Sequence, residues 1–364
     1  MRCVPCEIES STRLKLTKTL LPCYLEVIHI FSNEAYACIV KNQEMFFQWE
    51  KLGCLINPAE VTNSSWVSEY AQAPNTLVFD EFVRIFFCSR QPVDENGQYV
   101  SRVGFADLEV NGKPSITQIS RNAILPLGGI GNFDQFGTYP FSPLRVNNEF
   151  LAVYAGWTRS ESTPFDVSLG LAHGNQDATE FARHSDGPVL TKSLNEPFVI
   201  SSPKLRFFHG KYYLFYIAGK QWINNEKRID PIYTIRMAIS DDAVNWKRKD
   251  KEIIAPVLEF EAQASPDVFF KDGLFHMFFC YRYGKDFRQA GRGYRMGYAY
   301  SEDLLSWHRD DARSDLRASD SGWDSESISY PHVFDFQSRT FMLYLGNNVG
   351  KTGMGIARLV TNEN

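Results

Sequence analysis

The chain has 364 residues, of which 44% are hydrophobic and 22% charged, a balance that excludes a disordered chain. Its 43 acidic and 38 basic residues leave a net charge of −5, which argues against nucleic acid as a partner because phosphate binding usually leaves a basic excess. No run of 18 apolar residues is present, so neither a transmembrane helix nor a membrane partner is expected. The seven cysteines include a single C-x-x-C and no second pair at zinc spacing, which favours a reducing, cytoplasmic setting.

The first 44 residues lie outside any repeat and are interpreted as an N-terminal extension of unknown role, with one domain over residues 45–364. Five segments of that domain share a pattern: a proline near the start of an apolar strand, a polar turn, and a second aromatic-rich strand. These prolines stand at positions 74, 143, 203, 266 and 331, so the units are 69, 60, 63 and 65 residues apart. Units of this length made only of strands are typical of propeller blades.

Each unit continues with a third strand, expected at 103–108, 167–172, 235–239, 296–300 and 354–357. A fourth strand follows a tight turn, most clearly after S-x-D-x-x-x-W at 240–246 and 301–307, where the Asp side chain suits a turn rather than catalysis. The fifth unit ends without a fourth strand, whereas residues 46–51 around Trp49 resemble an isolated one. We therefore predict an all-β, five-bladed β-propeller in which the N-terminal strand closes the ring and removes its exposed edges.

Acidic side chains recur near the starts of the first strands, where the axial cavity of a propeller opens. The four candidate catalytic residues are Asp134, Glu196, Asp267 and Glu326. Cations, aromatic rings and amides recur at the same end of the blades, and the candidate substrate contacts are Asn75, Arg90, Trp157, Arg159, Lys220, Arg282, Tyr330, His332 and Asn347. Paired carboxylates are what cleavage of a glycosidic bond needs, and Arg and Lys would hold a carboxylate or phosphate. The pattern predicts a carbohydrate site.

Structural roles stay open for several of these residues. Asp134 could cap a turn, Asp267 could bond the backbone of the neighbouring blade, and Glu326 could be solvated. The two arginines Arg90 and Arg282 could form ion pairs between blades. His332 could equally be a hydrogen-bonded core histidine.

Several motifs together resemble the five-bladed β-propeller glycoside hydrolase superfamily of families 43, 32 and 130, most closely the uncharacterised family-43-like glycosidases. They are YAQAP at 70–74, NFDQFG at 132–137, YAGW at 154–157, QASPD at 263–267 and WDSESISYP at 323–331. The resemblance covers about residues 45–360. It implies the propeller fold, a carbohydrate substrate and a glycosidase activity.

The resemblance also implies roles for individual positions. The general base of family 43 would fall within 72–75 (QAPN), which contains no Asp. Asp134 would be the residue that tunes its partner's pKa, and Glu196 would be the general acid; Asp267 and Glu326 have no clear counterpart in the family's triad. We expect Asp134 to act as base or pKa partner and Glu196 or Glu326 to act as the acid. The missing Asp leaves open a phosphorylase or glycosyl transferase, a non-catalytic sugar-binding propeller, or a protein-interaction propeller. Some members hold calcium in the axial channel, but nothing in this sequence marks a metal or cofactor site.

Overall fold

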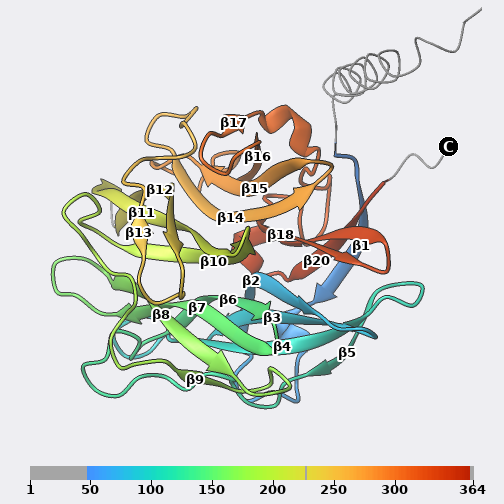
Figure 1. Cartoon of the computed structure of the whole chain (residues 1–364), viewed down its shortest axis with the longest axis horizontal. Coiled ribbons are helices and arrows are strands. Elements are labelled where there is room, and N and C mark those ends of the chain that lie inside the picture. The colour runs from blue at the N-terminus through green and yellow to red at the C-terminus, as the bar shows by residue number, and fades with distance from the viewer. Residues whose placement is uncertain (1–46, 226–227, 361–364) are drawn as a thin grey trace, which may run out of the picture. The chain divides into compact units, whose positions relative to one another are not determined.

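The computed structural model describes residues 47–225 and 228–360, all within one compact unit. They form five four-stranded sheets of antiparallel strands. Figure 1 shows the first strands of the blades gathered toward the middle of the unit, with the sheets arranged around them. The predicted all-β, five-bladed propeller is confirmed. The predicted extension 1–44 and its boundary at residue 45 lie outside the described residues.

The blades are numbered in chain order by their inner strands. Blade 1 contains β2 (Glu69–Val78), β3 (Val83–Arg90), β4 (Ser101–Glu109) and β5 (Ser115–Ile119). Blade 2 contains β6 (Thr138–Val146), β7 (Glu149–Thr158), β8 (Asp166–Gly174) and β9 (Phe181–Arg183). Blade 3 contains β10 (Ile200–Phe208), β11 (Lys211–Asn225), β12 (Arg228–Ser240) and β13 (Lys247–Arg248). Blade 4 contains β14 (Ala262–Lys271), β15 (Leu274–Arg282), β16 (Arg295–Ser301) and β17 (His308–Arg309). Blade 5 contains β18 (Ser329–Phe336), β19 (Arg339–Leu345), β20 (Met354–Leu359) and β1 (Trp49–Ile56). Short helical turns occupy η1 (Pro58–Glu60), η2 (Asp311–Ser314) and α2 (Asn347–Gly350).

The N-terminal strand closes the ring as predicted. β1 pairs antiparallel with β20, from Trp49 opposite Leu359 to Ile56 opposite Met354. The outermost strand of blade 5 therefore comes from the other end of the domain. Because this pairing joins the two ends of the described part of the chain, neither end of the blade array is left as an unpaired sheet.

Local sequence explains the turns within the blades. The β10–β11 turn uses His209 and Gly210, both with positive φ (51° and 74°), and such two-residue turns match the twist of paired strands. Before the fourth strands, Asp242 and Asp303 each accept hydrogen bonds from backbone N–H groups two and three residues ahead, at 2.8–2.9 Å. These bonds hold the pKa of Asp242 below its usual range. The prediction that the S-x-D-x-x-x-W segments are structural turns is confirmed.

Aromatic side chains fill the space between neighbouring blades. Phe86 of β3 stacks on Phe141 of β6 with ring centroids 5.7 Å apart, and Phe47, just before β1, meets Phe278 of β15 at 5.1 Å. A buried aromatic ring removes ~150–250 Å² from water, so at about 25 cal/mol per Å² each contributes several kcal/mol. These contacts make the blades a rigid frame for the loops.

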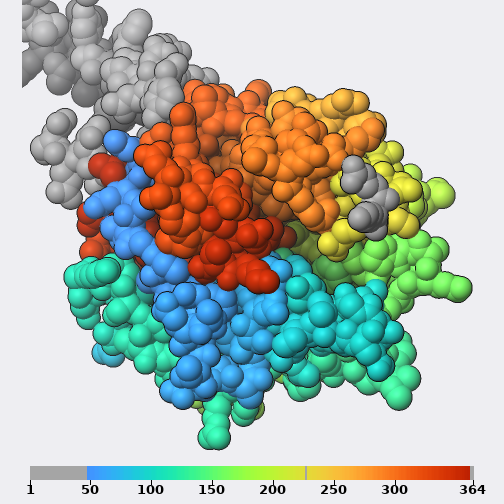
Figure 2. Space-filling model, turned by 180° about the vertical axis from the view of Figure 1, so that it is seen from behind, coloured from blue at the N-terminus to red at the C-terminus, as the bar shows by residue number. Residues whose placement is uncertain are grey.

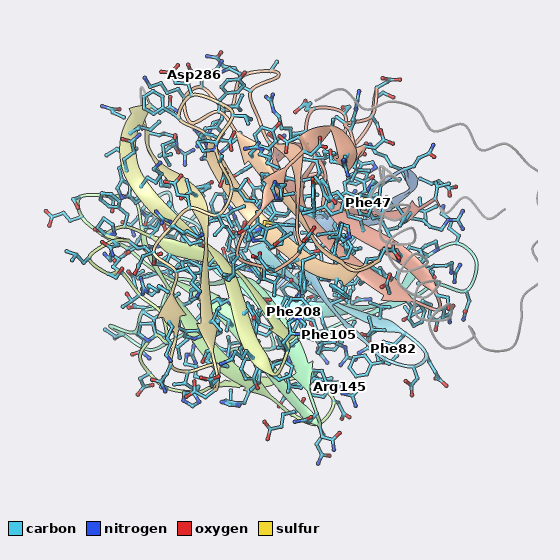
Figure 3. The ribbon with its side chains drawn as sticks, turned by 45° about the horizontal axis from the view of Figure 1, so that its top comes forward. Phe47, Phe82, Phe105, Arg145, Phe208 and Asp286 are labelled. Carbon is cyan, nitrogen blue, oxygen red and sulfur yellow. The ribbon has the colours of Figure 1, made fainter. Side chains whose placement is uncertain are left out.

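The two faces of the ring carry different connections. Figure 3 shows Arg145, near the far end of inner strand β6, and Asp286, in the loop after β15, on opposite sides of the domain. Because β6 and β7 are antiparallel, the starts of inner strands and the ends of second strands share one face. No helix in the described part of the chain is both long and apolar enough to cross a membrane.

Candidate functional site

A cavity of about 860 Å³ opens on the face where the inner strands start and the second strands end. All five blades line it, including Arg90, Trp157, Tyr233, Arg282 and Tyr330. Figure 2 shows a hollow near the middle of the domain, bordered by segments from several blades. This volume lies in the ~300–1,000 Å³ range of small-molecule sites.

The inner strands are bent at the cavity end. In every blade the register between first and second strand slips there, as it does between Ser201 and Lys204. In four blades the residue before the repeat's proline has a positive φ of 49–53°, namely Ala73, Ser202, Ser265 and Tyr330. Such a bulge interrupts the hydrogen-bond ladder between the strands, so a proline, which lacks an N–H, is tolerated there. The bulge also changes the direction of the preceding side chain. The proline that reveals the repeat in the sequence therefore also marks the cavity end of four blades, whereas in blade 2 the bulge holds Pro140 and Pro143 pairs regularly with Ala152.

Arg90, the last residue of β3, is surrounded by tyrosines. Its guanidinium carbon lies 4.8, 5.2 and 5.5 Å from the ring centres of Tyr70, Tyr99 and Tyr139. The Nε donates a 2.8 Å hydrogen bond to the fully buried amide oxygen of Gln72. A neutral amide thus orients this arginine, and aromatic faces attract its charge.

Arg282, the last residue of β15, occupies the corresponding place in blade 4. It is only 3% exposed. Its guanidinium carbon lies 3.7 Å from the ring centre of Phe287 and 5.5 Å from those of Tyr233 and Tyr294. Two of its nitrogens donate to neutral oxygens, the Tyr283 carbonyl at 2.9 Å and the Tyr233 hydroxyl at 3.3 Å.

Tyrosines connect the two arginines across the cavity. The hydroxyl of Tyr139 donates to that of Tyr330 at 3.2 Å, and the hydroxyls of Tyr233 and Tyr294 are 2.6 Å apart. The rings of Tyr294 and Tyr330 meet edge to face at 6.1 Å. Burial raises the pKa of Tyr139, Tyr294 and Tyr330, so these hydroxyls stay protonated at neutral pH.

Among the described residues, Asp230 is the single carboxylate that lines the cavity. It lies near the start of β12 and is about nine-tenths buried. Arg288 donates to both of its oxygens at 3.1 and 3.2 Å, and Asn225 donates at 3.2 Å. Burial raises the pKa of Asp230, but these donors more than offset it, so its pKa lies below the ordinary value. Asp230 is therefore an ionised carboxylate facing the cavity.

Two of the predicted catalytic acids lie elsewhere, which corrects the expectation that they converge on the axial cavity. Asp134 and Glu196 are fully buried within their blades and do not line the cavity. Asp134 accepts from Arg183 at 2.7 Å and from the Tyr154 hydroxyl at 2.9 Å. Neither acid simply caps a turn.

Glu196 repeats this arrangement one blade further on. It accepts from Arg248 at 2.5 Å and from the Tyr216 hydroxyl at 2.8 Å. In both blades the acid precedes the inner strand, the tyrosine lies on the second strand and the arginine lies on the fourth. The three groups tie the innermost to the outermost part of one blade.

The same tie recurs in two blades where other acids supply the carboxylate. Asp324 accepts from the Tyr344 hydroxyl at 3.1 Å and from Lys51, on the closing strand, at 2.6 Å. Glu261 pairs with Arg309 at 2.7 Å in blade 4. Blade 1 has an uncharged hydrogen bond at this place, in which the Trp66 indole donates to the Ser120 carbonyl at 2.8 Å. Two of the four predicted catalytic acids, Asp134 and Glu196, are thus accounted for by a repeated structural contact, which we call the blade tie.

Asp267 and two predicted substrate contacts meet at a different place. Asn75, Ser142, Lys204, Asp267 and His332 hold equivalent register positions on the five inner strands, opposite Phe86, Val153, Phe215, Phe278 and Leu343. All five are buried, and none lines the cavity. They form a polar layer inside the ring, which corrects the expectation that Asn75, Asp267 and His332 face the substrate.

Asp267 is the central acceptor of this layer and pairs with two cations. Asp267 accepts from Lys204 at 2.9 Å, from Arg206 at 2.6 Å and from the Val333 N–H of the neighbouring blade at 2.5 Å. His332 lies 3.1 Å from Asp267, and the other ring nitrogen lies 2.8 Å from the Thr76 hydroxyl. The structure shows the two structural alternatives: Asp267 bonds the backbone of a neighbouring blade, and His332 is a hydrogen-bonded core histidine.

The remaining predicted residues lie in three places: Trp157 and Arg159 at the cavity, Lys220 and Glu326 on the surface, and Asn347 buried away from the cavity. Arg159 and Trp157 line the cavity; Arg159 is paired with Asp94, and the Trp157 indole donates to the Tyr139 carbonyl. Glu326 is exposed, as its structural alternative proposed. The Asn347 side chain accepts from backbone N–H groups of the loop before β18, and Lys220 pairs with Glu252 at 2.8 Å; neither lines the cavity.

Sequence reasoning missed Asp230, Tyr233 and Tyr294. Asp230 and Tyr233 lie on an extension of the β11–β12 hairpin, whose strands have 15 and 13 residues where other second and third strands have 6 to 10. The continuous apolar alternation through residues 229–239 was the available signal, because a strand that begins four to seven residues before its equivalents must project beyond them. Tyr294 precedes β16 in a loop without a distinctive pattern. No group of three or more His, Cys, Asp or Glu side chains able to hold a metal ion occurs in the described ranges.

Comparison with known proteins identifies relatives over most of the chain. The Mycobacterium tuberculosis protein named "Uncharacterized protein Rv1502" (strain ATCC 25618 / H37Rv) is 32% identical over 314 residues, which are 85% of this chain and 99% of the relative. "Uncharacterized protein MT1551" of strain CDC 1551 / Oshkosh matches equally well. The chain belongs to the family of these mycobacterial proteins. No family model matches the sequence.

Solved structures share the fold of this family. A structure titled "Glycoside hydrolase" superposes with a TM-score of 0.67 at 15% identity, over 95% of this chain and 96% of the other. A thermostable family-43 glycoside hydrolase gives a TM-score of 0.59 at 15% identity, over 83% and 94%. A structure from the family of mannoside phosphorylases that contains glycoside hydrolases targeting beta-1,2 mannosidic linkages gives 0.60 at 14%, over 87% and 94%. The chain therefore has the five-bladed propeller fold of glycoside hydrolase families 43, 32 and 130, as predicted.

Proposed function

We propose that this protein is a carbohydrate-active enzyme that binds a saccharide in the cavity and cleaves or transfers a glycosidic bond there. The observation that carries the proposal is the composition of the cavity wall: aromatic faces from several blades, protonated tyrosine hydroxyls, arginines and one ionised carboxylate. Flat apolar rings suit the faces of sugars, and hydroxyl and guanidinium donors suit their oxygens. The shared fold with glycoside hydrolases supports the same class of substrate by analogy alone.

The chemistry we propose uses one protein carboxylate. Hydrolysis by a carboxylate pair requires two acids about 5–5.5 Å apart for retention or ~6.5–9.5 Å apart for inversion. Asp230 has no carboxylate partner among the described cavity residues. We assign Asp230 as the base that accepts the proton of an incoming hydroxyl or water while that oxygen attacks the anomeric carbon. As its bond to the anomeric carbon breaks, the departing oxygen takes a proton from water in the open cavity, while the buried hydroxyls of Tyr139 and Tyr330 hydrogen-bond it and Asp230 holds the nucleophile's proton.

Phosphate is the alternative nucleophile, as in a phosphorylase on this fold. Phosphate attacks without a protein base, and the cavity arginines suit its charge. A non-catalytic sugar-binding propeller is the second candidate, and the single cavity carboxylate is the observation that favours it. Turnover separates these possibilities, since only the first two consume substrate.

The test is a turnover screen of neutral and acidic oligosaccharides, with and without inorganic phosphate, using release of reducing ends or sugar phosphate as the readout. Asp230→Asn keeps the shape of the side chain and its hydrogen bond to Asn225, and we expect turnover to fall ~10²–10⁴-fold, the usual effect of losing a general base. Exposed Glu326 provides the matched control, and Glu326→Gln should keep full turnover. Full turnover by the Asp230→Asn variant would refute the assigned role.

A further inference from the structure

Two buried or partly buried cavity arginines lack an acidic partner within the described residues, as does the exposed Arg228, whereas Arg159 and the exposed Arg288 each have one. Arg159 is paired with Asp94, and Arg288 is paired with Asp230. Arg282 and Arg90 form no ion pair with any described carboxylate; their side-chain bonds go to a carbonyl, a tyrosine hydroxyl and an amide. The carboxylate opposite Arg90 in the ladder, Glu69, pairs with Lys351 instead.

A cation at 3% exposure with no carboxylate in direct contact is unusual; Arg282 acts on the cavity carboxylate Asp230 only through space, where its charge helps to lower the pKa of Asp230. Buried charges in proteins are normally paired, because removing an ion from water costs several kcal/mol that neutral partners only partly recover. Every other buried cation of the described ranges, such as Lys204, Arg84 or Arg309, has a carboxylate within 3 Å. Arg282 departs from this rule, and it does so on the wall of the cavity.

The two arginines hold equivalent places in the fold, each at the end of a second strand, one in blade 1 and one in blade 4. Tyr139, Tyr330 and Tyr294 run between them in contact. Arg90 lies against the Tyr139 end of this row and Arg282 against the Tyr294 end. A ligand lying along the row would have a cation at each end and aromatic faces between them.

We propose that the missing counter-charges are supplied by the substrate, and that the substrate class is an acidic oligosaccharide that presents one anionic group to Arg282 and a second to Arg90. This inference rests on the proposed function and specifies its substrate. A guanidinium binds carboxylate and phosphate oxygens through two parallel N–H bonds, so uronic acid and phosphorylated sugars share the required chemistry. Neutral saccharides would leave both arginines unpaired and should bind more weakly.

The experiment is calorimetric titration of the full-length protein with four probes: hexuronic acid oligomers of two to four sugars, their neutral hexose counterparts, hexose phosphates, and inorganic phosphate. We expect an acidic oligomer, carboxylated or phosphorylated, to bind at least 100-fold more tightly than its neutral counterpart. We expect this preference to weaken as salt concentration rises. The two acidic probes identify which anion the site selects.

Variants locate the interaction. Arg282→Gln and Arg90→Gln should each lower affinity for the acidic oligomer at least 30-fold and change affinity for the neutral one less than threefold. Because Arg282 is an unpaired buried cation, Arg282→Gln should melt at or above the wild-type temperature without ligand, yet lose the rise in melting temperature that the acidic oligomer causes. Arg309→Gln is the matched control: this buried, ion-paired arginine lies outside the cavity, so its loss should lower stability and leave affinity unchanged.

The outcomes separate this inference from the proposed function. Equal binding of neutral and acidic oligomers overturns the acidic substrate and leaves a carbohydrate enzyme standing. Saturation by inorganic phosphate, with no acidic oligomer bound, overturns the inference in favour of phosphate as a co-substrate. Failure of every saccharide to bind overturns both. Loss of stability in ligand-free Arg282→Gln, with its acid preference retained, would give Arg282 a structural role instead.

Discussion

The blade tie around Glu196 gives a prediction that separates a structural acid from a catalytic one. Glu196→Gln keeps the size of the side chain but leaves Arg248 without its counter-charge at 15% side-chain exposure. Breaking a buried ion pair from one side costs about 3–5 kcal/mol. The glutamine oxygen can still accept from Tyr216, so we expect the lower end of that range, about 3 kcal/mol.

This loss corresponds to a measurable change in melting temperature. An unfolding entropy of ~2.1 cal/mol/K per residue over roughly 310 residues gives about 0.65 kcal/mol/K, and therefore a decrease of about 5 °C. Scanning calorimetry measures the decrease, and saccharide turnover is measured on the same samples below the transition. Replacing both Glu196 and Arg248 with methionine should recover most of the loss, because no charge is then left buried alone.

The opposite result has a clear meaning. If Glu196→Gln keeps the wild-type melting temperature and loses turnover by a factor of 10² or more, Glu196 is the general acid that the resemblance to family 43 implies. The assignment of the periodic acids to blade ties would then be refuted for that blade.

Three further predictions concern titration, packing and thiol reactivity. Burial, and then the charge of Lys204, lower the pKa of His332 to about 4, so the unfolded chain binds a proton that the folded chain does not between pH 6.5 and 4. The free energy of unfolding should therefore fall as pH falls through this window, by about 3 kcal/mol at pH 4. When this free energy is measured by urea titration at each pH, His332→Gln should weaken its dependence on pH between 6.5 and 4; an unchanged dependence would contradict the prediction. Gly156→Ala should lower the melting temperature, because the added Cβ would lie 2.4 Å from the Phe133 ring, and an unchanged value would show that this ring can move. Burial raises the pKa of the Cys88 and Cys280 thiols, so neither should react with a thiol reagent at pH 8 until the protein unfolds, and rapid labelling of either in the native protein would count against this packing.

The fold could be predicted because residues with special backbone properties recur at equivalent places in the blades. The prolines at 74, 203, 266 and 331 stand where four inner strands are bulged, whereas in blade 2 the bulge holds Pro140 and the predicted Pro143 pairs regularly with Ala152; Trp49 stands where the last blade lacks a strand. Arg90, Trp157 and Arg282 could likewise be placed at the cavity, since the ends of second strands must face it.

The carboxylates could not be placed in the same way. A periodic acid signals that some contact repeats from blade to blade, but the partners of Asp134 and Glu196 lie about 50 residues later on the fourth strands. The available signal was a basic residue two positions after the repeated aromatic residue, as in Arg183 after Phe181 and Arg248 after Trp246. Asp230 is the converse case. It occurs in one blade only, on a hairpin longer than its equivalents, so the comparison of repeated units does not identify it.

The most direct test of the account is a crystal structure with a bound acidic oligosaccharide. We predict density in the cavity beside Trp157 and Tyr330, with an anionic group against Arg282 and the reacting sugar within hydrogen-bond distance of Asp230. An oligosaccharide bound instead against Asp134 or Glu196, with Arg248 or Arg183 displaced to admit it, would contradict the account.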